Sequence, residues 1–201
     1  MRKLFALVML AAVAAAAPAA ADTIGPQGGG ANNVVIVRTT SDQAWRARSH
    51  VQVASVGGGT VASANLADAE AVACTGCRAS AVAVQVLFVT GDPNVYTPAN
   101  VAVAANGGCS TCGTYAYAWQ YLLQTDGPVY LSPAGRLAVG VLQQEVADTV
   151  ASIDPTSLAA DEELTSELDA LTAQLESVVN SEVQAVGVHA SGTPLRQVRQ
   201  G

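Results

Sequence analysis

Apolar and polar residues alternate along the first half of the chain at the two-residue period of a β-strand. Residues 34–39 are rich in β-branched side chains, and residues 45–56 place Trp45, Val51 and Val53 on one face and polar side chains on the other. Three consecutive glycines at 57–59 interrupt this pattern. We therefore expect strands over 34–39 and 45–56, each bounded by a turn.

The chain then contains an internal duplication with a shift of 35 residues. Residues 63–99 and 98–134 align without a gap, and 14 of the 37 aligned positions are identical, including the cysteines, one asparagine and one glutamine. Each unit, near 63–97 and 98–131, contains a short strand, a turn carrying C-x-x-C and a long strand. Two units are too few for a solenoid, so we predict an antiparallel β-sheet of duplicated hairpins within a β-rich domain over 34–131.

The aromatic segment 113–125, GTYAYAWQYLLQT, fits either a helix or a strand when it is considered alone. Its counterpart in the first unit has valine at alternate positions, which favours a strand. Because duplicated units should fold alike, we expect strands over 79–90 and 114–125.

After Leu131 the apolar residues recur at helical spacing. Ser132 and Pro133 suit the cap and first turn of a helix, and a leucine stripe from Leu164 to Leu175 predicts a second helix. We expect a helical hairpin over 132–186 that packs on one face of the sheet, which makes the fold class α+β. Residues 187–201 have no apolar periodicity and are expected to form a disordered tail.

The first 21 residues have the layout of a secretory signal peptide. Two basic residues precede an apolar stretch that ends in small residues. This layout predicts a secreted, extracellular protein with no membrane span after signal cleavage. The glycine-rich residues 22–33 are expected to form a flexible leader.

The charge distribution narrows the choice of partners. The formal net charge is −7, and residues 145–182 contain ten acidic residues and no basic one. An acidic chain without a basic patch argues against nucleic acid as a partner. The partner stays unknown, with an envelope component or another protein as the remaining classes.

Four cysteines, Cys74, Cys77, Cys109 and Cys112, allow three kinds of chemistry. Export to an oxidising compartment favours disulfides. A bridge within one C-x-x-C contributes about 2 kcal/mol in the chain-entropy model and a bridge between units about 4 kcal/mol, which favours bridges between units. The alternatives are a zinc site made by all four thiolates and a redox-active thiol pair.

Two other groups of side chains are candidates for binding. Arg46, Arg48 and His50 share the polar face of one strand and could bind an anion, although a solvated face is the more usual role of such a stripe. An aromatic row could stack on a ligand if it is exposed, but at strand spacing it more often belongs to the core. This row, the possible ligand surface, consists of Tyr115, Tyr117, Trp119 and Tyr121.

The combination of CTGC, VAVQV, TGDP, NVAVAAN, CSTC, WQY and SPAGR is similar to a family of secreted actinobacterial proteins with duplicated C-x-x-C units. A similar segment occurs at one end of some membrane proteins labelled peptide zinc metalloproteases. The resemblance covers roughly residues 34–185 and implies no catalytic residues for this segment.

Together these patterns predict a non-catalytic secreted domain that is stabilised by disulfides, needs no cofactor and has a binding or envelope-associated role. The chain lacks the common hydrolase and metalloprotease motifs, so we do not expect an enzyme. The alternatives are a zinc-binding accessory module of a peptide-processing metalloprotease system and a thiol oxidoreductase.

Overall fold

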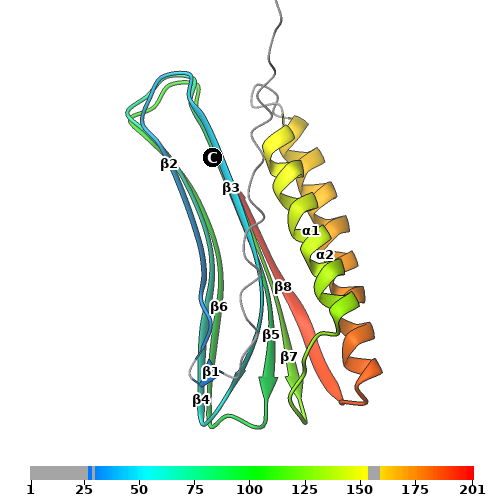
Figure 1. Ribbon diagram of the computed structural model, residues 1–201. Coiled ribbons are helices and arrows are strands. Elements are labelled where there is room, and N and C mark those ends of the chain that lie inside the picture. The colour runs from blue at the N-terminus through cyan, green and yellow to red at the C-terminus, as the bar shows by residue number, and fades with distance from the viewer. Residues whose placement is uncertain (1–26, 29, 154–158) are drawn as a thin grey trace, which may run out of the picture.

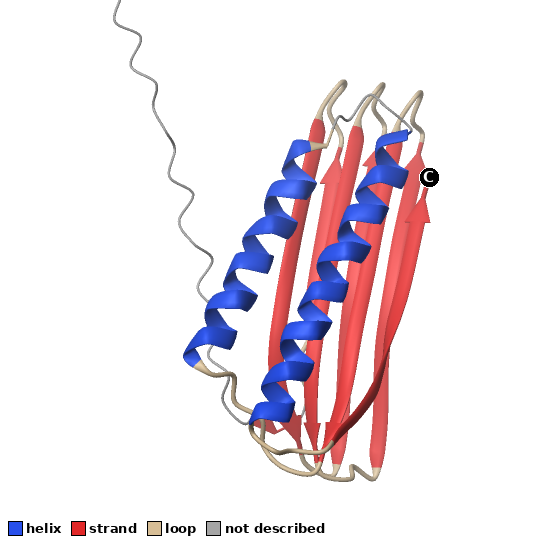
Figure 2. Cartoon of the chain, turned by 90° about the vertical axis from the view of Figure 1, so that its right-hand side faces the viewer, coloured by secondary structure: helices blue, strands red, loops and turns tan. Residues whose placement is uncertain are grey.

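The computed structural model describes residues 27–28, 30–153 and 159–201, so the predicted signal peptide lies outside the described residues. These residues form three layers, two β-sheets and a pair of helices (Figure 1). The helices lie on the outer face of the sheet that contains β3, β5 and β7, as Figure 2 shows.

The strands alternate between the two sheets along the chain. The outer sheet has the order β2-β4-β6, and the central sheet has the order β1-β3-β5-β7-β8. The bounds of the strands are β1 Gln27–Gly28, β2 Asn33–Thr39, β3 Trp45–Gly57, β4 Thr60–Val72, β5 Arg78–Thr90, β6 Val95–Gly107, β7 Gly113–Thr125 and β8 Ala190–Gln200. Each pair β2–β3, β4–β5 and β6–β7 therefore makes one coil of a flat solenoid.

The α+β class is confirmed, but the antiparallel hairpins are not. Strands β2, β4 and β6 pair in parallel, as do β3, β5 and β7. The turn that carries each C-x-x-C leads from one sheet to the other, so the two strands of a unit face each other instead of pairing. Parallel stacking at the repeat period places like residues side by side, for example Asn65 beside Asn100 and Gln85 beside Gln120.

Small side chains fill most of the space between the two sheets. Buried alanines from both sheets form one core cluster there, including Ala67, Ala69, Ala81 and Ala116. Because alanine keeps the sheets close together, short amide side chains can cross from one sheet to the other. The abundance of alanine in both repeat units is thus explained by the narrow interior of the solenoid.

The helical hairpin, α1 (Pro133–Ser152) and α2 (Ala159–Ala185), packs on the central sheet as predicted. The hydroxyl of Ser132 caps α1 by accepting from the backbone N–H of Gly135 at 3.0 Å. The carboxylate of Glu182, on α2, accepts from the backbone N–H and the hydroxyl of Ser132, which joins the two helices. No helix among the described residues is long and apolar enough to span a membrane.

The expected disordered tail is wrong, because residues 190–200 form β8, which pairs antiparallel with β7 along its length. Without β8, the backbone of β7 would be an open sheet edge; β8 forms hydrogen bonds with its free N–H and C=O groups. Part of the expected flexible leader is also ordered, since Gln27 and Gly28 pair with the end of β3 and Asn33 begins β2.

Candidate functional site

Three turns, at 40–44, 73–77 and 108–112, stack on one another along the side of the solenoid where the cysteines lie. The backbone N–H of Gly76 donates to the carbonyl of Ser110 at 2.9 Å, and the N–H of Ser110 donates to the carbonyl of Cys74 at 3.1 Å. The third residue of each C-x-x-C is left-handed, with φ of 64° at Gly76 and 54° at Thr111. This conformation lets each short turn reverse the chain and bring its two cysteines to the same side.

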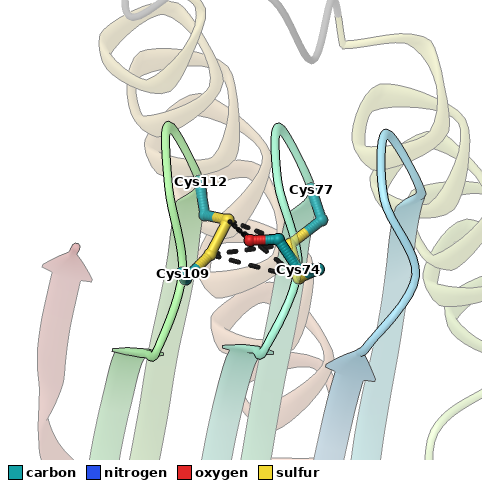
Figure 3. A group of neighbouring side chains, drawn as sticks. All are labelled: Cys74, Cys77, Cys109 and Cys112. Atoms are coloured by element: carbon teal, nitrogen blue, oxygen red, sulfur yellow. Dashed lines mark hydrogen bonds between the residues drawn. A yellow bond between two sulfur atoms is a disulfide. The ribbon is translucent and has the colours of Figure 1, made fainter.

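The four cysteines form two stacked disulfides, which we call the clasp (Figure 3). Cys74 is bridged to Cys77, and Cys109 is bridged to Cys112. The expectation of bridges between the units is therefore wrong. The two strands that flank each turn lie in opposite sheets, so each turn closes across the gap between the sheets, and a bridge across its base lies within one coil.

The two bridges touch each other across the coils. The Sγ of Cys77 lies 3.0 Å from that of Cys112 and 3.7 Å from that of Cys109, and the Sγ of Cys74 lies 4.0 Å from each of them. A bridged sulfur carries no proton, so these are packing contacts and not hydrogen bonds. Cys74 and Cys77 are buried, and Cys109 and Cys112 are partly buried.

When the four cysteines are reduced, the same arrangement fits a zinc ion. All four Sγ atoms lie within 4.8 Å of one another. A tetrahedral site with Zn–S bonds of about 2.3 Å has sulfur–sulfur edges of about 3.8 Å, close to three of the four sulfur–sulfur distances between the two bridges. Opening both disulfides would give four thiolates of suitable number and spacing, so the donor set fits zinc.

Arg78, the cation next to the clasp, forms an ion pair with a residue of α2. The guanidinium of Arg78 lies 3.6 Å from the carboxylate of Asp161 on α2, and both side chains are largely buried. Burial raises the pKa of Asp161, and the positive charge of Arg78 opposes this shift. Gly113 makes room for the pair, because a Cβ there would lie 2.6 Å from Nε of Arg78. This ion pair fixes α2 to the clasp end of the sheet.

The aromatic row is core and not a ligand surface. Tyr115, Tyr117, Trp119 and Tyr121 have exposed fractions of at most 4 % and lie in the cluster beneath the helices. The tyrosine hydroxyls reach polar side chains of α2: Tyr117 donates to Asp169 at 2.9 Å and Tyr121 donates to Asn180 at 3.0 Å. Burial raises the pKa of Tyr115 and Tyr117 well above the ordinary range. The row therefore holds α2 in register on the sheet.

Two ladders of side-chain amides run through the solenoid, and sequence reasoning found only part of each. In the first ladder, Asn33 donates to Asn65 at 2.9 Å and Asn65 donates to Asn100 at 2.8 Å. These side chains also donate to carbonyls of the central sheet, so they bind the two sheets together.

The second ladder consists of Gln52, Gln85 and Gln120, with amide contacts of 2.7 Å between neighbours. The sequence comparison at a fixed shift of 35 residues did not include the first coil. Its spacing to the second coil is 32 residues in the asparagine ladder and 33 residues in the glutamine ladder. An alignment that allows short gaps at the turns would have placed Asn33 and Gln52 in the repeat.

The remaining sequence candidates lie at the open end of the solenoid. Arg46 and Arg48 are exposed on β3, and they line a groove together with Arg38 and Ile36 of β2. The ring Nδ1 of His50 lies 2.6 Å from Oδ1 of Asn33, which ends the asparagine ladder on this side. His50 is therefore structural, whereas no described carboxylate forms an ion pair with Arg46 or Arg48.

Comparison with protein-family models, with curated proteins and with solved structures finds no significant match. The architecture and the clasp therefore carry the functional argument on their own.

Proposed function

We propose that the chain is a non-catalytic secreted β-solenoid domain that acts through binding or envelope association. The clasp is the observation that carries this proposal. Two bridges consume all four thiols, and their sulfurs pack against each other in the stacked turns along one side of the solenoid. A structural clasp of this kind suits a protein outside the reducing cytosol, in agreement with the pattern of residues 1–21.

The burial of the Cys74–Cys77 bridge weighs against the thiol oxidoreductase alternative. A redox-active pair needs a sulfur that a partner thiol can reach and a group that lowers its pKa. Cys77 has no exposed surface, and Cys74 is only 4 % exposed. The neighbouring cation, Arg78, is engaged with Asp161 and with its surroundings on the sheet.

The second candidate function is a zinc-binding accessory module of a peptide-processing metalloprotease system. The specific observation in its favour is the mutual proximity of four sulfur donors. Zinc would then tie the two turns together through four thiolates, and the same fold would be stabilised by metal binding instead of oxidation. The two candidates differ in the redox state of the same four atoms.

One experiment separates these functions. The full chain is expressed with its N-terminal segment in a bacterium grown with added zinc, and the exported protein is collected without reductant. We expect an intact mass that begins at Asp22, four hydrogens lighter than the fully reduced chain, and no stoichiometric zinc by elemental analysis. One zinc per chain with four free thiols would establish the accessory module instead, and retention of the whole protein in the cytoplasm would refute secretion.

A further inference from the structure

The two ends of the solenoid differ in how their backbone is covered. At the C-terminal end, β8 pairs with β7 along its length, and the side chain of Gln197 also accepts from the backbone N–H of Ala102 on β6. At the N-terminal end, β1 pairs only with Val56 and Gly57 of β3. Within the part of the chain that the structure describes, no strand pairs with the outer edge of β3 from residue 45 to 55, although the side chain of Gln143 on α1 donates to the carbonyl of Val51 at 2.8 Å. Open edges present hydrogen-bonding groups to an added strand.

The side chains at this open edge are unusual for their positions. Arg46 is in register with Ala79 and Thr114, and Arg48 is in register with Ala81 and Ala116. In the inner coils these positions are small and buried between the sheets. In the first coil they carry two exposed arginines that have no carboxylate partner among the described residues.

A third arginine and several apolar side chains complete the groove. Arg38 on β2 contacts Glu70 at 3.4 Å and remains more than half exposed. Apolar surface lies between the charges, contributed by Ile36, Val37, Trp45, Ala47 and Ala151. Three of the seven described arginines therefore surround one groove of a chain whose net charge is −7. This local concentration of positive charge suits an anionic ligand.

The spacing of the two unpaired charges indicates the shape of that ligand. Arg46 and Arg48 are two residues apart on a strand, so their Cα atoms are separated by about 6.6 Å along it. A peptide added as the next strand repeats its side chains on one face at the same interval. Directly opposed residues on paired strands have Cβ atoms about 5 Å apart, which allows opposite charges to pair. An extended segment with acidic residues at alternate positions therefore matches both the backbone and the charges.

We propose that the open edge of β3 at Arg46 and Arg48 binds an acidic extended peptide of a partner protein by strand addition. This inference rests on the proposed binding function and names its partner chemistry. A second copy of the chain does not fit the same edge. Two copies joined edge to edge at residues 46–48 would oppose their own arginine pairs, and a copy docked through β8 would bring these arginines toward Arg199, which lies on the same face of the sheet.

The test uses the full exported chain and a fluorescein-labelled nine-residue peptide that alternates glutamate and valine. Binding is measured by fluorescence anisotropy at low and at physiological salt. Two control peptides carry lysine in place of glutamate, or the same glutamates and valines grouped in two blocks. The test variant is Arg46→Gln with Arg48→Gln, and the matched control is Arg136→Gln with Arg199→Gln, which removes the same charge from exposed positions elsewhere.

We expect saturable binding of the alternating acidic peptide, weakened about tenfold or more by the double substitution on β3 and less than twofold by the control pair. Equal binding of the block peptide would overturn strand addition. Absence of saturable binding, equal loss in both variants, or a concentration-dependent dimer that blocks the groove would overturn the proposal. Failure of the peptide test with intact disulfides and normal export would leave the proposed function standing, whereas a zinc-loaded chain with free thiols would refute that function whatever the peptide does.

Discussion

Replacement of Asn65 by alanine should destabilise the protein more than any surface substitution, because Asn65 is the centre of the asparagine ladder. Its side chain is fully buried and accepts from Asn33. It donates to Asn100 and to the carbonyls of Ala83 and Trp119, at 2.8–3.0 Å. The substitution removes these bonds and leaves the amide oxygen of Asn100 buried without its ladder donor.

The expected cost follows from the hydrogen bonds. A buried hydrogen bond contributes about 0.5–1.5 kcal/mol net, and an orphaned buried acceptor costs about 1–3 kcal/mol. Some of the affected groups keep other partners, such as the sheet carbonyls, so the contributions do not simply add. We expect the free energy of unfolding to fall by about 3–5 kcal/mol.

The assay is urea unfolding of the oxidised protein, followed by circular dichroism, with Asn106→Ala as the control. Asn106 lies on β6 in the same sheet but is exposed, so its substitution should change stability by less than about 0.5 kcal/mol. If Asn65→Ala costs no more than the control, the ladder does not hold the two sheets together and this reasoning is wrong.

Three further substitutions test other contacts. Burial, together with the nearby charge of Glu70, raises the pKa of Asp68 above 3.8. The variant Asp68→Asn should therefore have a higher melting temperature than the wild type at pH 7, and this difference should shrink as the pH falls toward 3.8. A difference that does not depend on pH would contradict this reasoning. A Cβ at Gly192 would overlap a backbone oxygen of β7, so Gly192→Ala should abolish the hydrogen-exchange protection of β8. As the control, Gly140→Ala on an exposed face of α1 should stabilise the chain by about 1 kcal/mol. Tyr117→Phe removes a hydroxyl that donates to the carboxylate of Asp169 on α2 and should lower the free energy of unfolding by about 1–3 kcal/mol. Because burial raises the pKa of the Tyr117 phenol, the stability of the wild type should fall as the pH rises above about 10, and that of the variant should fall less steeply.

The features that depend on local sequence were predicted correctly. Ser132 and Pro133 mark the beginning of α1 because capping involves only neighbouring residues. The leucine stripe of α2 predicted its buried face, since Leu164, Leu168 and Leu175 are buried. The strand at 113–125 was recognised only through its counterpart, because its own pattern also fits a helix.

The pairing of strands was not predictable from the same patterns. An alternating strand with apolar residues on one face fits a hairpin or a solenoid equally, and the choice depends on whether the turn joins strands within a sheet or across two sheets. The fully buried strands β5 and β7 offered a signal, because strands buried on both faces are typical of parallel sheets. The strand β8 was missed because ASGTPLRQVRQ has little apolar content, and its order comes from backbone pairing with β7.

The location of the charged groove illustrates why a site at a repeat boundary is hard to recognise. Arg46 and Arg48 occupy positions that are alanine or threonine in the inner coils. A strand with alternating arginines has the pattern of an ordinary solvated face when it is considered alone. Only the three-coil register shows that these arginines replace interior residues at the open end of the solenoid.

The pairing of the four cysteines decides whether each C-x-x-C turn is closed by its own disulfide. Trypsin cleaves after Arg48, Arg78 and Arg136, so it separates Cys74 and Cys77 from Cys109 and Cys112. The exported protein is denatured, alkylated without reductant, digested and analysed by mass spectrometry. We expect two unlinked peptides, 49–78 and 79–136, each two hydrogens lighter than its reduced form and neither alkylated. A single species that joins the two peptides, or four alkylated cysteines, would refute this pairing.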